Sequence, residues 1–418
     1  MKLRSLTAAG LAAALLAVAG CGGDPDSGSG AASGPIDLRM TIWSANAKHL
    51  ALFDQIAADY KKDHPEIGKI TFEPIPFDSY STTLTTQIGG GNVPDLAWIF
   101  ESNAPDFVSS GALEPIDKDA DLLPSTTTNW EKDGKLYAYP FSTSPLGVFV
   151  NTDLVKAAGR PSPAQQIAAG TWTWEEAAKT AAAVQAKGKG GLVVGDFDYK
   201  GWDTLNAIWA GWGARPWSED GKSCQFDQPA MVDAMTFVHK LIFTDKGMPG
   251  PGVTKDFFAG ESSMILTQIS RAALLEKAKF KWDLVPLPKG PQGEYSVVGQ
   301  AGIGVFKRGK HADAAKQFLA YFSNAENSAK LAQFFPPPRK SQLNTATLAK
   351  ANPLLKPAQL DSVVVKGIEN GTIKPSHTGY AEVQQTVRAA LDPLWKPDAD
   401  VKAVLSGVCS KINPLLAK

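Results

Sequence analysis

The chain alternates short apolar runs with longer segments whose apolar residues recur at helical spacing. Residues 38–43 (LRMTIW) and 94–100 (PDLAWIF) are nearly continuous apolar runs, and 68–77 (GKITFEPIPF) form a further strand candidate between them. Residues 50–61 have the spacing of an amphipathic helix, and 78–92 begin as a helix and end in glycines. Strands that alternate with helices and are apolar on both faces are typical of a covered parallel sheet. The pattern therefore predicts an α/β fold.

The same alternation continues to the end of the chain. Strands are expected at 145–151, 261–268, 282–288 and 301–306. Helices are expected at 152–159, 173–188, 203–212, 229–246, 312–323, 325–335 and, with proline interruptions, 379–416. The helix at 173–188 has the clearest ends, because Thr173 suits the N-cap and Gly188 suits the stop.

The first twenty residues have the pattern of a secretory signal. Lys2 and Arg4 precede a short apolar segment, 6–18, and small residues lead to Cys21. That segment is too short to span a bilayer. The cysteine after VAG resembles a bacterial lipobox, which implies acylation of Cys21; an ordinary signal peptide with a chance cysteine is the alternative. Residues 21–35 have the composition of a flexible tether. We therefore expect a lipid-anchored protein at the outer face of the cytoplasmic membrane.

Length and charge narrow the class of protein. From Cys21 onward the chain has 398 residues, which is too long for one compact core, so two domains are expected. Without Lys2 and Arg4, 40 basic residues oppose 42 acidic residues, a net charge of −2. A nearly neutral chain offers no electrostatic surface for nucleic acid or for an anionic bilayer. The lipid on Cys21 is therefore the expected membrane contact.

Cysteine spacing and missing motifs argue against catalysis. Cys224 and Cys409 lie far apart in sequence, and an oxidising compartment favours a disulfide between them. No second Cys or His stands at metal-ligand spacing beside either one. Nucleophile-elbow, Walker A, HExxH and dinucleotide-binding motifs are missing. We therefore expect no catalytic residues, metal or cofactor, although spacing neither supports nor excludes the carboxylate pair of a glycosidase.

Six segments, taken in order, resemble the maltose-binding-protein-like family of extracellular solute-binding proteins (family 1), which serve carbohydrate ABC importers. They are 41–100 (TIWSANAKHL…PDLAWIF), 109–117 (SSGALEPID), 134–159 (GKLYAYPF…DLVKAAG), 171–184 (TWTWEEAAKTAAAV), 257–266 (FFAGESSMIL) and 310–341 (KHADAAKQ…FFPPPRKS). Each motif alone is weak, but their order over residues 36–416, behind a lipobox, is specific. Gly90–Gly91 stand where many relatives have Ala-Gly, and 334–341 are unusually rich in proline.

The resemblance implies a type II periplasmic-binding-protein fold, in which two α/β lobes enclose a ligand cleft. The N-terminal lobe would comprise 36–142 plus 286–336, and the C-terminal lobe 143–285 plus 337–418. The three hinge segments would fall at Pro140–Ser144, Val285–Gly290 and Phe335–Arg339. It also implies a monomeric receptor, not an enzyme, that closes on a mono- or oligosaccharide and delivers it to ABC permease subunits. The alternatives are another solute (a polyamine, glycerol phosphate or a peptide) and a secreted glycoside hydrolase.

Ligands of open α/β sheets bind beyond the carboxyl ends of the strands, and this rule selects candidate site residues. It selects Trp43, Asn46, Lys48, Glu101, Asn103, Ser144 and Arg271, and Tyr80 opens the helix after the second strand. The resemblance adds Arg339 at the hinge, Gln300 near the cleft, and His377 and Tyr380 before the last helices. Planar hydrogen-bonding side chains suit sugar hydroxyls, and aromatic rings suit the C–H faces. Solvated turns, an Arg271–Glu276 pair and a hinge salt bridge of Arg339 are the structural alternatives.

Residues 201–217, GWDTLNAIWAGWGARPW, concentrate four tryptophans. Trp202, Asn206 and Trp209 fall near one face of the predicted helix. The resemblance implies ligand contact at Trp202 and Trp209, whereas Trp212 and Trp217 are expected to pack into the domain. We therefore expect Trp202→Ala to abolish binding with little loss of stability, and Trp217→Ala to do the reverse.

Overall fold

The computed structural model of the protein describes residues 34–417. The predicted signal peptide, the predicted acylation site Cys21 and most of the predicted tether therefore lie outside the described residues. Within 34–417, none of the helices combines the length and apolarity needed to cross a membrane.

The first part of the described chain is a parallel α/β unit. It consists of β1 (Ile36–Ile42), α1 (Ala47–Asp63), β2 (Ile67–Pro74), α2 (Tyr80–Gly89) and β3 (Leu96–Phe100). β1 lies in the middle and pairs in parallel with both β2 and β3. The strand–helix alternation predicted from the apolar pattern is confirmed here, with boundaries that differ by a few residues.

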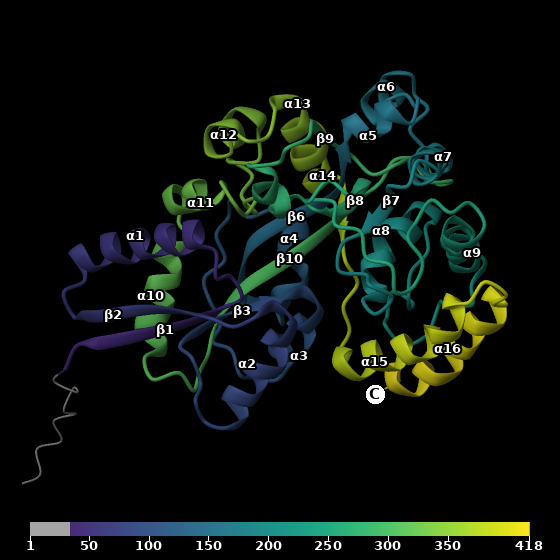
Figure 1. Cartoon of the computed structure of the whole chain (residues 1–418). Coiled ribbons are helices and arrows are strands. Elements are labelled where there is room, and N and C mark those ends of the chain that lie inside the picture. The colour runs from purple at the N-terminus through teal and green to yellow at the C-terminus, as the bar shows by residue number, and fades with distance from the viewer. Residues whose placement is uncertain (1–33, 418) are drawn as a thin grey trace, which may run out of the picture. The chain divides into compact units, whose positions relative to one another are not determined.

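The described residues form a nine-stranded mixed sheet, in the order β2-β1-β3-β10-β6-β8-β7, with β11 on β10 and β9 on β6. Its remaining strands are β6 (Ala138–Asn151), β7 (Gly190–Val194), β8 (Ser262–Gln268), β9 (Trp282–Val285), β10 (Ser296–Val305) and β11 (Gly371–Ile373). The antiparallel strands β6 and β10 are the longest, and in Figure 1 they run from the group of β1–β3 toward β7 and β8. A separate short hairpin joins β4 (Glu131–Lys132) to β5 (Lys135–Leu136).

Helices flank this sheet along its whole length (Figure 1). They are α3 (Ala104–Ser109), α4 (Pro124–Thr127), α5 (Thr152–Ala157), α6 (Pro163–Ala168), α7 (Trp174–Gln185), α8 (Asn206–Trp209), α9 (Pro229–Phe243), α10 (Ala312–Phe322), α11 (Ala325–Leu331), α12 (Thr345–Ala351), α13 (Pro357–Gln359), α14 (Lys366–Glu369), α15 (Tyr380–Leu391) and α16 (Val401–Leu416). The helix predicted at 203–212 is a single turn of α-helix, α8, between two 3-10 segments. Thr173 caps α7 by accepting a hydrogen bond from the backbone N–H of Glu176, as its position predicts.

Buried apolar side chains form three cores. The first core holds residues from 38–141 and 301–335, and the second holds residues from 146–297 and 380–416. The third, smaller core is built mainly from 257–284 and 332–368. Burial of this apolar surface is the main force that holds each group together.

The chain passes between the first and second cores within two strands. On β6 the change falls between Phe141 and Leu146, and on β10 it falls between Val297 and Ala301. The sequence places the second hinge segment earlier, at 285–290, but Leu287 packs in the second core. The proline pattern of 285–290 suggests a crossover there, whereas the structure carries the chain across on a continuous strand. The division of the chain into two domains at those boundaries stays a prediction.

A disulfide joins Cys224 to Cys409, residues 185 apart in sequence. It ties the segment after the 3-10 turn at 210–212 to α16, and both sulfurs are buried in the second core. The C-terminal helix is thereby fixed covalently to the same core that its apolar face covers.

Candidate functional site

A narrow pocket lies where the end of β3 meets three segments of the second core. Its walls come from the turn after β3, the tryptophan-rich segment, the loop after β11 and the start of α15. Side chains nearly fill the pocket: its free volume is about 10 Å³, roughly the space of one water molecule. The lining residues are Glu101, Ser102, Trp202, Asp203, Asn206, Trp209, Pro216, Lys374, Pro375 and Tyr380.

Three charged side chains meet in this pocket. The ammonium of Lys374 lies 3.2 Å from Oε1 of Glu101 and 3.6 Å from Oδ2 of Asp203. The Lys374 side chain is 14% exposed and the Glu101 side chain 9% exposed. Burial disfavours the charged lysine, but the two carboxylates outweigh it and raise the pKa of Lys374 above its ordinary value. The pocket therefore contains a permanent ammonium held between two acids.

Two tryptophans form an aromatic wall of the pocket. The rings of Trp202 and Trp209 stack at 6.0 Å between centroids, and Phe226 packs edge-on against both. The indole N–H of Trp202 donates to the carbonyl oxygen of Gln384, 3.1 Å away. The indole nitrogen of Trp209 is buried and has no hydrogen-bond partner among residues 34–417. Buried donors are almost always paired, so an unpaired one beside a pocket indicates a missing partner such as a ligand.

Tyr380 and Asn206 complete the polar lining. Tyr380 is the first residue of α15, and its side chain is buried. Burial, and then the nearby carboxylates of Asp203 and Glu101, raise the pKa of its phenol. Asn206 begins α8, is 5% exposed and lines the pocket from the tryptophan-rich segment.

A second aromatic group lies at the carboxyl ends of β1 and β3. Trp43 stacks on Phe100 with 4.2 Å between ring centroids, and Phe77 packs edge-on against Phe100 at 5.1 Å. Phe77 is 49% exposed, which is unusual for a large apolar side chain. Because Glu101 directly follows Phe100, this group, which we call the aromatic edge, continues from the pocket along the ends of the parallel strands.

Five of the fourteen residues selected from the sequence line the pocket together. They are Glu101, Trp202, Asn206, Trp209 and Tyr380. Trp202 is only 2% exposed and packs in the second core. The expectation that its removal leaves stability almost unchanged therefore conflicts with its burial: the same ring lines the pocket and fills the core.

Two other residues selected from the sequence form hydrogen bonds inside the core. The hydroxyl of Tyr80 donates to the carbonyl oxygens of Thr41 and Trp98, and its side chain is 1% exposed. Gln300 accepts from the indole N–H of Trp130 and donates to the carbonyl oxygen of Thr126. Both polar groups already have partners inside the fold, because each residue points from its element into the first core rather than outward.

Further selected residues take structural roles at the surface or the hinge strands. Their contacts are a hydrogen bond from the Ser270 N–H to Ser144, an ion pair of Arg271 with Asp196, an ion pair of Lys48 with Glu276, an N-cap of α1 by Asn46, and a hydrogen bond from Ser81 to Asn103. Arg271 therefore pairs with Asp196 and not with Glu276. None of these residues lines the pocket described above.

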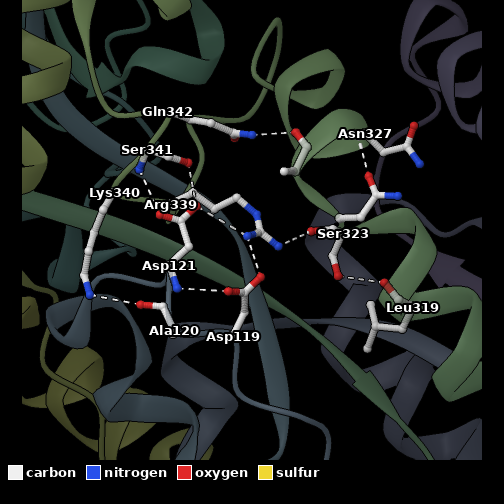
Figure 2. Close-up of polar contacts among 12 residues, drawn as sticks. Asp119, Ala120, Asp121, Leu319, Ser323, Asn327, Arg339, Lys340, Ser341 and Gln342 are labelled. Carbon is white, nitrogen blue, oxygen red and sulfur yellow. Dashed lines mark hydrogen bonds and ion pairs between the residues drawn. The ribbon is translucent and has the colours of Figure 1, made fainter.

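Arg339 forms a polar cluster at the third predicted hinge segment (Figure 2). Its guanidinium donates to Asp119 at 2.6 Å and to the carbonyl oxygen of Ser323 at 2.7 Å, and Asp121 lies 3.5 Å away. Arg339 is 4% exposed. It thus ties the loop before α4 to the end of α10, and the salt bridge that the sequence offered as its structural alternative is present.

The pocket also contains residues that the sequence did not select. They are Ser102, Asp203, Pro216, Lys374 and Pro375. Lys374 follows the three-residue strand β11, so the carboxyl-end rule would have found it had that strand been visible. Asp203 adjoins Trp202, but nothing in its spacing marked it. Among the described residues, no group of His, Cys, Asp and Glu side chains is arranged to hold a metal ion.

Comparison with known proteins gives one family and one fold. Residues 45–329, more than half of the chain, match the sequence profile of a family described as bacterial extracellular solute-binding protein. The chain is 24% identical to the arabinooligosaccharide-binding protein of Bacillus subtilis over 75% of each chain. It is 25% identical to the sn-glycerol-3-phosphate-binding periplasmic protein of Salmonella paratyphi A, over 66% of this chain and 68% of that one.

The fold is also that of solved substrate-binding proteins. An ABC substrate-binding protein from Listeria monocytogenes in complex with cycloalternan has a TM-score of 0.78 and 21% identity, covering 91% of this chain and 98% of that one. This fold has two lobes. We refer to the part of the present chain around the first core as the first lobe, and to the part around the second and third cores as the second lobe.

Proposed function

Because the chain belongs to the bacterial extracellular solute-binding proteins, a family of transport binding proteins, we propose that it binds an uncharged mono- or oligosaccharide and delivers it to the permease subunits of an ABC importer. The observation that carries this proposal is the pocket in which stacked tryptophans lie beside two carboxylates and an ammonium. We further propose that the receptor acts as a monomer and without catalysis.

The chemistry of the pocket suits a sugar. Glu101 and Asp203 accept hydrogen bonds from hydroxyl groups, Lys374 donates, and Asn206 does both. The rings of Trp202 and Trp209, which stack on each other and are almost fully buried, line the pocket with apolar surface, and the unpaired indole N–H of Trp209 offers a further donor. The aromatic edge of Trp43, Phe77 and Phe100 would extend contact along the first lobe.

The charge of the pocket favours an uncharged ligand. Two carboxylates face one ammonium, which leaves a net negative charge of one among the ionised side chains of the lining. A phosphate ligand needs several cationic groups or helix N-termini, so glycerol phosphate fits poorly even though one relative binds it. A polyamine would suit the carboxylates, but Lys374 already occupies them.

A glycoside hydrolase remains the alternative of another class. The structure adds Asp203 to Glu101, so the pocket holds two carboxylates, the group that such an enzyme requires. However, both carboxylates contact the same ammonium, that of Lys374, whereas a hydrolase needs its two carboxylates on opposite sides of the scissile bond. This arrangement favours binding over hydrolysis.

A thermal-shift screen tests the proposed ligand class. Purified protein is heated with mono- and disaccharides, with sn-glycerol 3-phosphate and with spermidine, each at millimolar concentration. A matching sugar is expected to raise the melting temperature, because it binds only the folded state. A shift with the phosphate or the polyamine alone, or with no sugar at all, would overturn the assignment. Release of monosaccharide from the same mixtures would identify a hydrolase.

We also propose that a lipid on Cys21 holds the receptor at the outer face of the cytoplasmic membrane. The support is the lipobox-like sequence that precedes Cys21. Intact-mass measurement should find an acylated N-terminus on the wild-type protein, whereas Cys21→Ser should be recovered without lipid. Recovery of both proteins free of lipid would contradict the proposal.

A further inference from the structure

We propose that residues 374–380 form a clasp, fixed to the second lobe, that Glu101 and Asp106 of the first lobe hold through the protein's own contacts. The clasp would keep the two lobes together and set how much of the closed state exists before a solute arrives. The inference concerns the protein's own contacts and does not depend on which solute binds.

The first contact of the clasp is the ammonium of Lys374. It lies 3.2 Å from Glu101, which follows β3 of the first lobe, and 3.6 Å from Asp203 in the second lobe. Lys374 and Glu101 are both largely removed from solvent, so water screens their attraction weakly. Separating the lobes would leave Lys374 with Asp203 alone and would expose Glu101.

The second contact is a helix cap supplied from the other lobe. Gly379 is the N-cap residue of α15, and as a glycine it has no side chain to bond the free N–H groups of the first turn. A carboxylate oxygen of Asp106, on α3 of the first lobe, accepts the Gly379 N–H at 2.7 Å. A negative charge at the start of a twelve-residue helix is also favoured by the helix dipole.

The clasp is anchored firmly on its own lobe. Between its two contacts, a ring nitrogen of His377 bonds the carbonyl oxygen of Gly221 at 2.9 Å, and the His377 ring packs edge-on against Trp217. At its end, Tyr380 packs in the second core. The clasp therefore moves with the second lobe, and opening must break the Lys374–Glu101 and Gly379–Asp106 contacts together.

A further polar contact between the lobes is weaker. Lys48 and Glu276 form an ion pair at 2.6 Å, but their side chains are 60% and 52% exposed. Exposed pairs contribute little, because water and salt screen them. The balance between open and closed forms should thus respond mainly to the clasp.

Distances between spin labels test the clasp in ligand-free protein. One label is placed at Thr85→Cys on α2 and one at Lys402→Cys on α16, both exposed positions in opposite lobes. Asp106→Ala and Lys374→Met should each shift population toward longer distances. Loss of one cap corresponds to about a fivefold change in the ratio of closed to open forms. Asp117→Ala, an exposed first-lobe residue with no side-chain partner among residues 34–417, should leave the distances unchanged.

The outcomes are distinguishable. Longer distances in both variants, with wild-type circular dichroism, support the clasp. Wild-type distances in both, or a shift with Lys374→Met but none with Asp106→Ala, overturn it. If no sugar raises the melting temperature while the labels still separate in both variants, the sugar assignment fails and the clasp stands. If a sugar binds and the distances between the labels stay unchanged in both variants, the clasp fails and the sugar assignment stands.

Discussion

Trp209 combines a buried ring with an indole nitrogen that has no partner within residues 34–417. Trp209→Phe should retain most of the packing against Trp202 and Phe226 while it removes the N–H donor. We expect sugar affinity to fall roughly tenfold, since one hydrogen bond contributes about 1 kcal/mol or slightly more. Stability without ligand should fall only slightly, because removal of the buried unpaired donor offsets part of the cost of the smaller ring. Isothermal titration and urea unfolding measure the two effects, and unchanged affinity would contradict the assigned role.

His49 is a half-buried titratable residue outside the pocket. Its ring lies 4.3 Å from Phe334 and 5.0 Å from Phe335, between centroids, and its Nδ1 bonds the hydroxyl of Ser44. Burial lowers the pKa of His49 to about 4. Between pH 6.5 and 4, His49 is therefore protonated in the unfolded chain but mostly unprotonated in the native state.

The sign of the resulting pH effect follows from that difference. The free energy of unfolding should be fully retained above pH 6.5 and should decrease as the pH falls toward 4. When the pH falls from 7 to 4.5, the free energy of unfolding of His49→Asn should decrease by about 2–3 kcal/mol less than that of the wild-type protein, because Asn does not titrate. Urea unfolding at both pH values gives the comparison, and parallel losses in the two proteins would exclude His49 as the cause.

At the same scale, burial limits what a sequence can assign. The carboxyl-end rule selected Glu101, which lines the pocket, yet the sequence equally selected Tyr80 and Gln300, whose polar groups bond backbone and side chains inside the fold. The direction in which a side chain points depends on packing between segments far apart in sequence. Lys374 was missed because its strand, β11, has three residues and no readable apolar pattern.

At the scale of elements, the sequence predicted helices and strands best where the apolar pattern and the capping residues of a single element were sufficient. The long helix α7 and the buried strand β3 appear where periodicity and caps place them. The passage of the chain between the two cores was harder to place, because β10 carries it as one strand, and nothing in the composition of that strand marks the change. Pairing of long strands across two cores is a property of tertiary structure.

The Arg339 cluster tests how elements at the hinge are held together. Arg339→Met should reduce the free energy of unfolding by about 2–4 kcal/mol, since it leaves Asp119 and the Ser323 carbonyl without their donor. Because Arg339 lies outside the pocket, sugar affinity measured on folded protein should change by less than about twofold. Lys340→Met, at the neighbouring exposed position, is the matched control and should lose less than about 0.5 kcal/mol. Loss of affinity with unchanged stability would instead place Arg339 in the ligand site.

At the scale of the whole described molecule, the disulfide and the shared strands act on the same unfolding transition. The bond between Cys224 and Cys409 joins residues 185 apart in sequence, and it therefore restricts the conformations that the unfolded chain can adopt. A cross-link of this span contributes about 2–5 kcal/mol in the chain-entropy account. The bond lies in the second core, but β6 and β10 cross from that core into the first.

Unfolding of the second core would expose half of each shared strand, so the first core should not survive alone. We therefore expect the double variant Cys224→Ala and Cys409→Ala to lower the melting temperature by several degrees in one calorimetric transition. Reduction of the wild-type protein should reproduce the shift, and a reductant should leave the double variant unchanged. A first transition that moves while a second stays fixed would show that the two lobes unfold independently, and that β6 and β10 do not couple them.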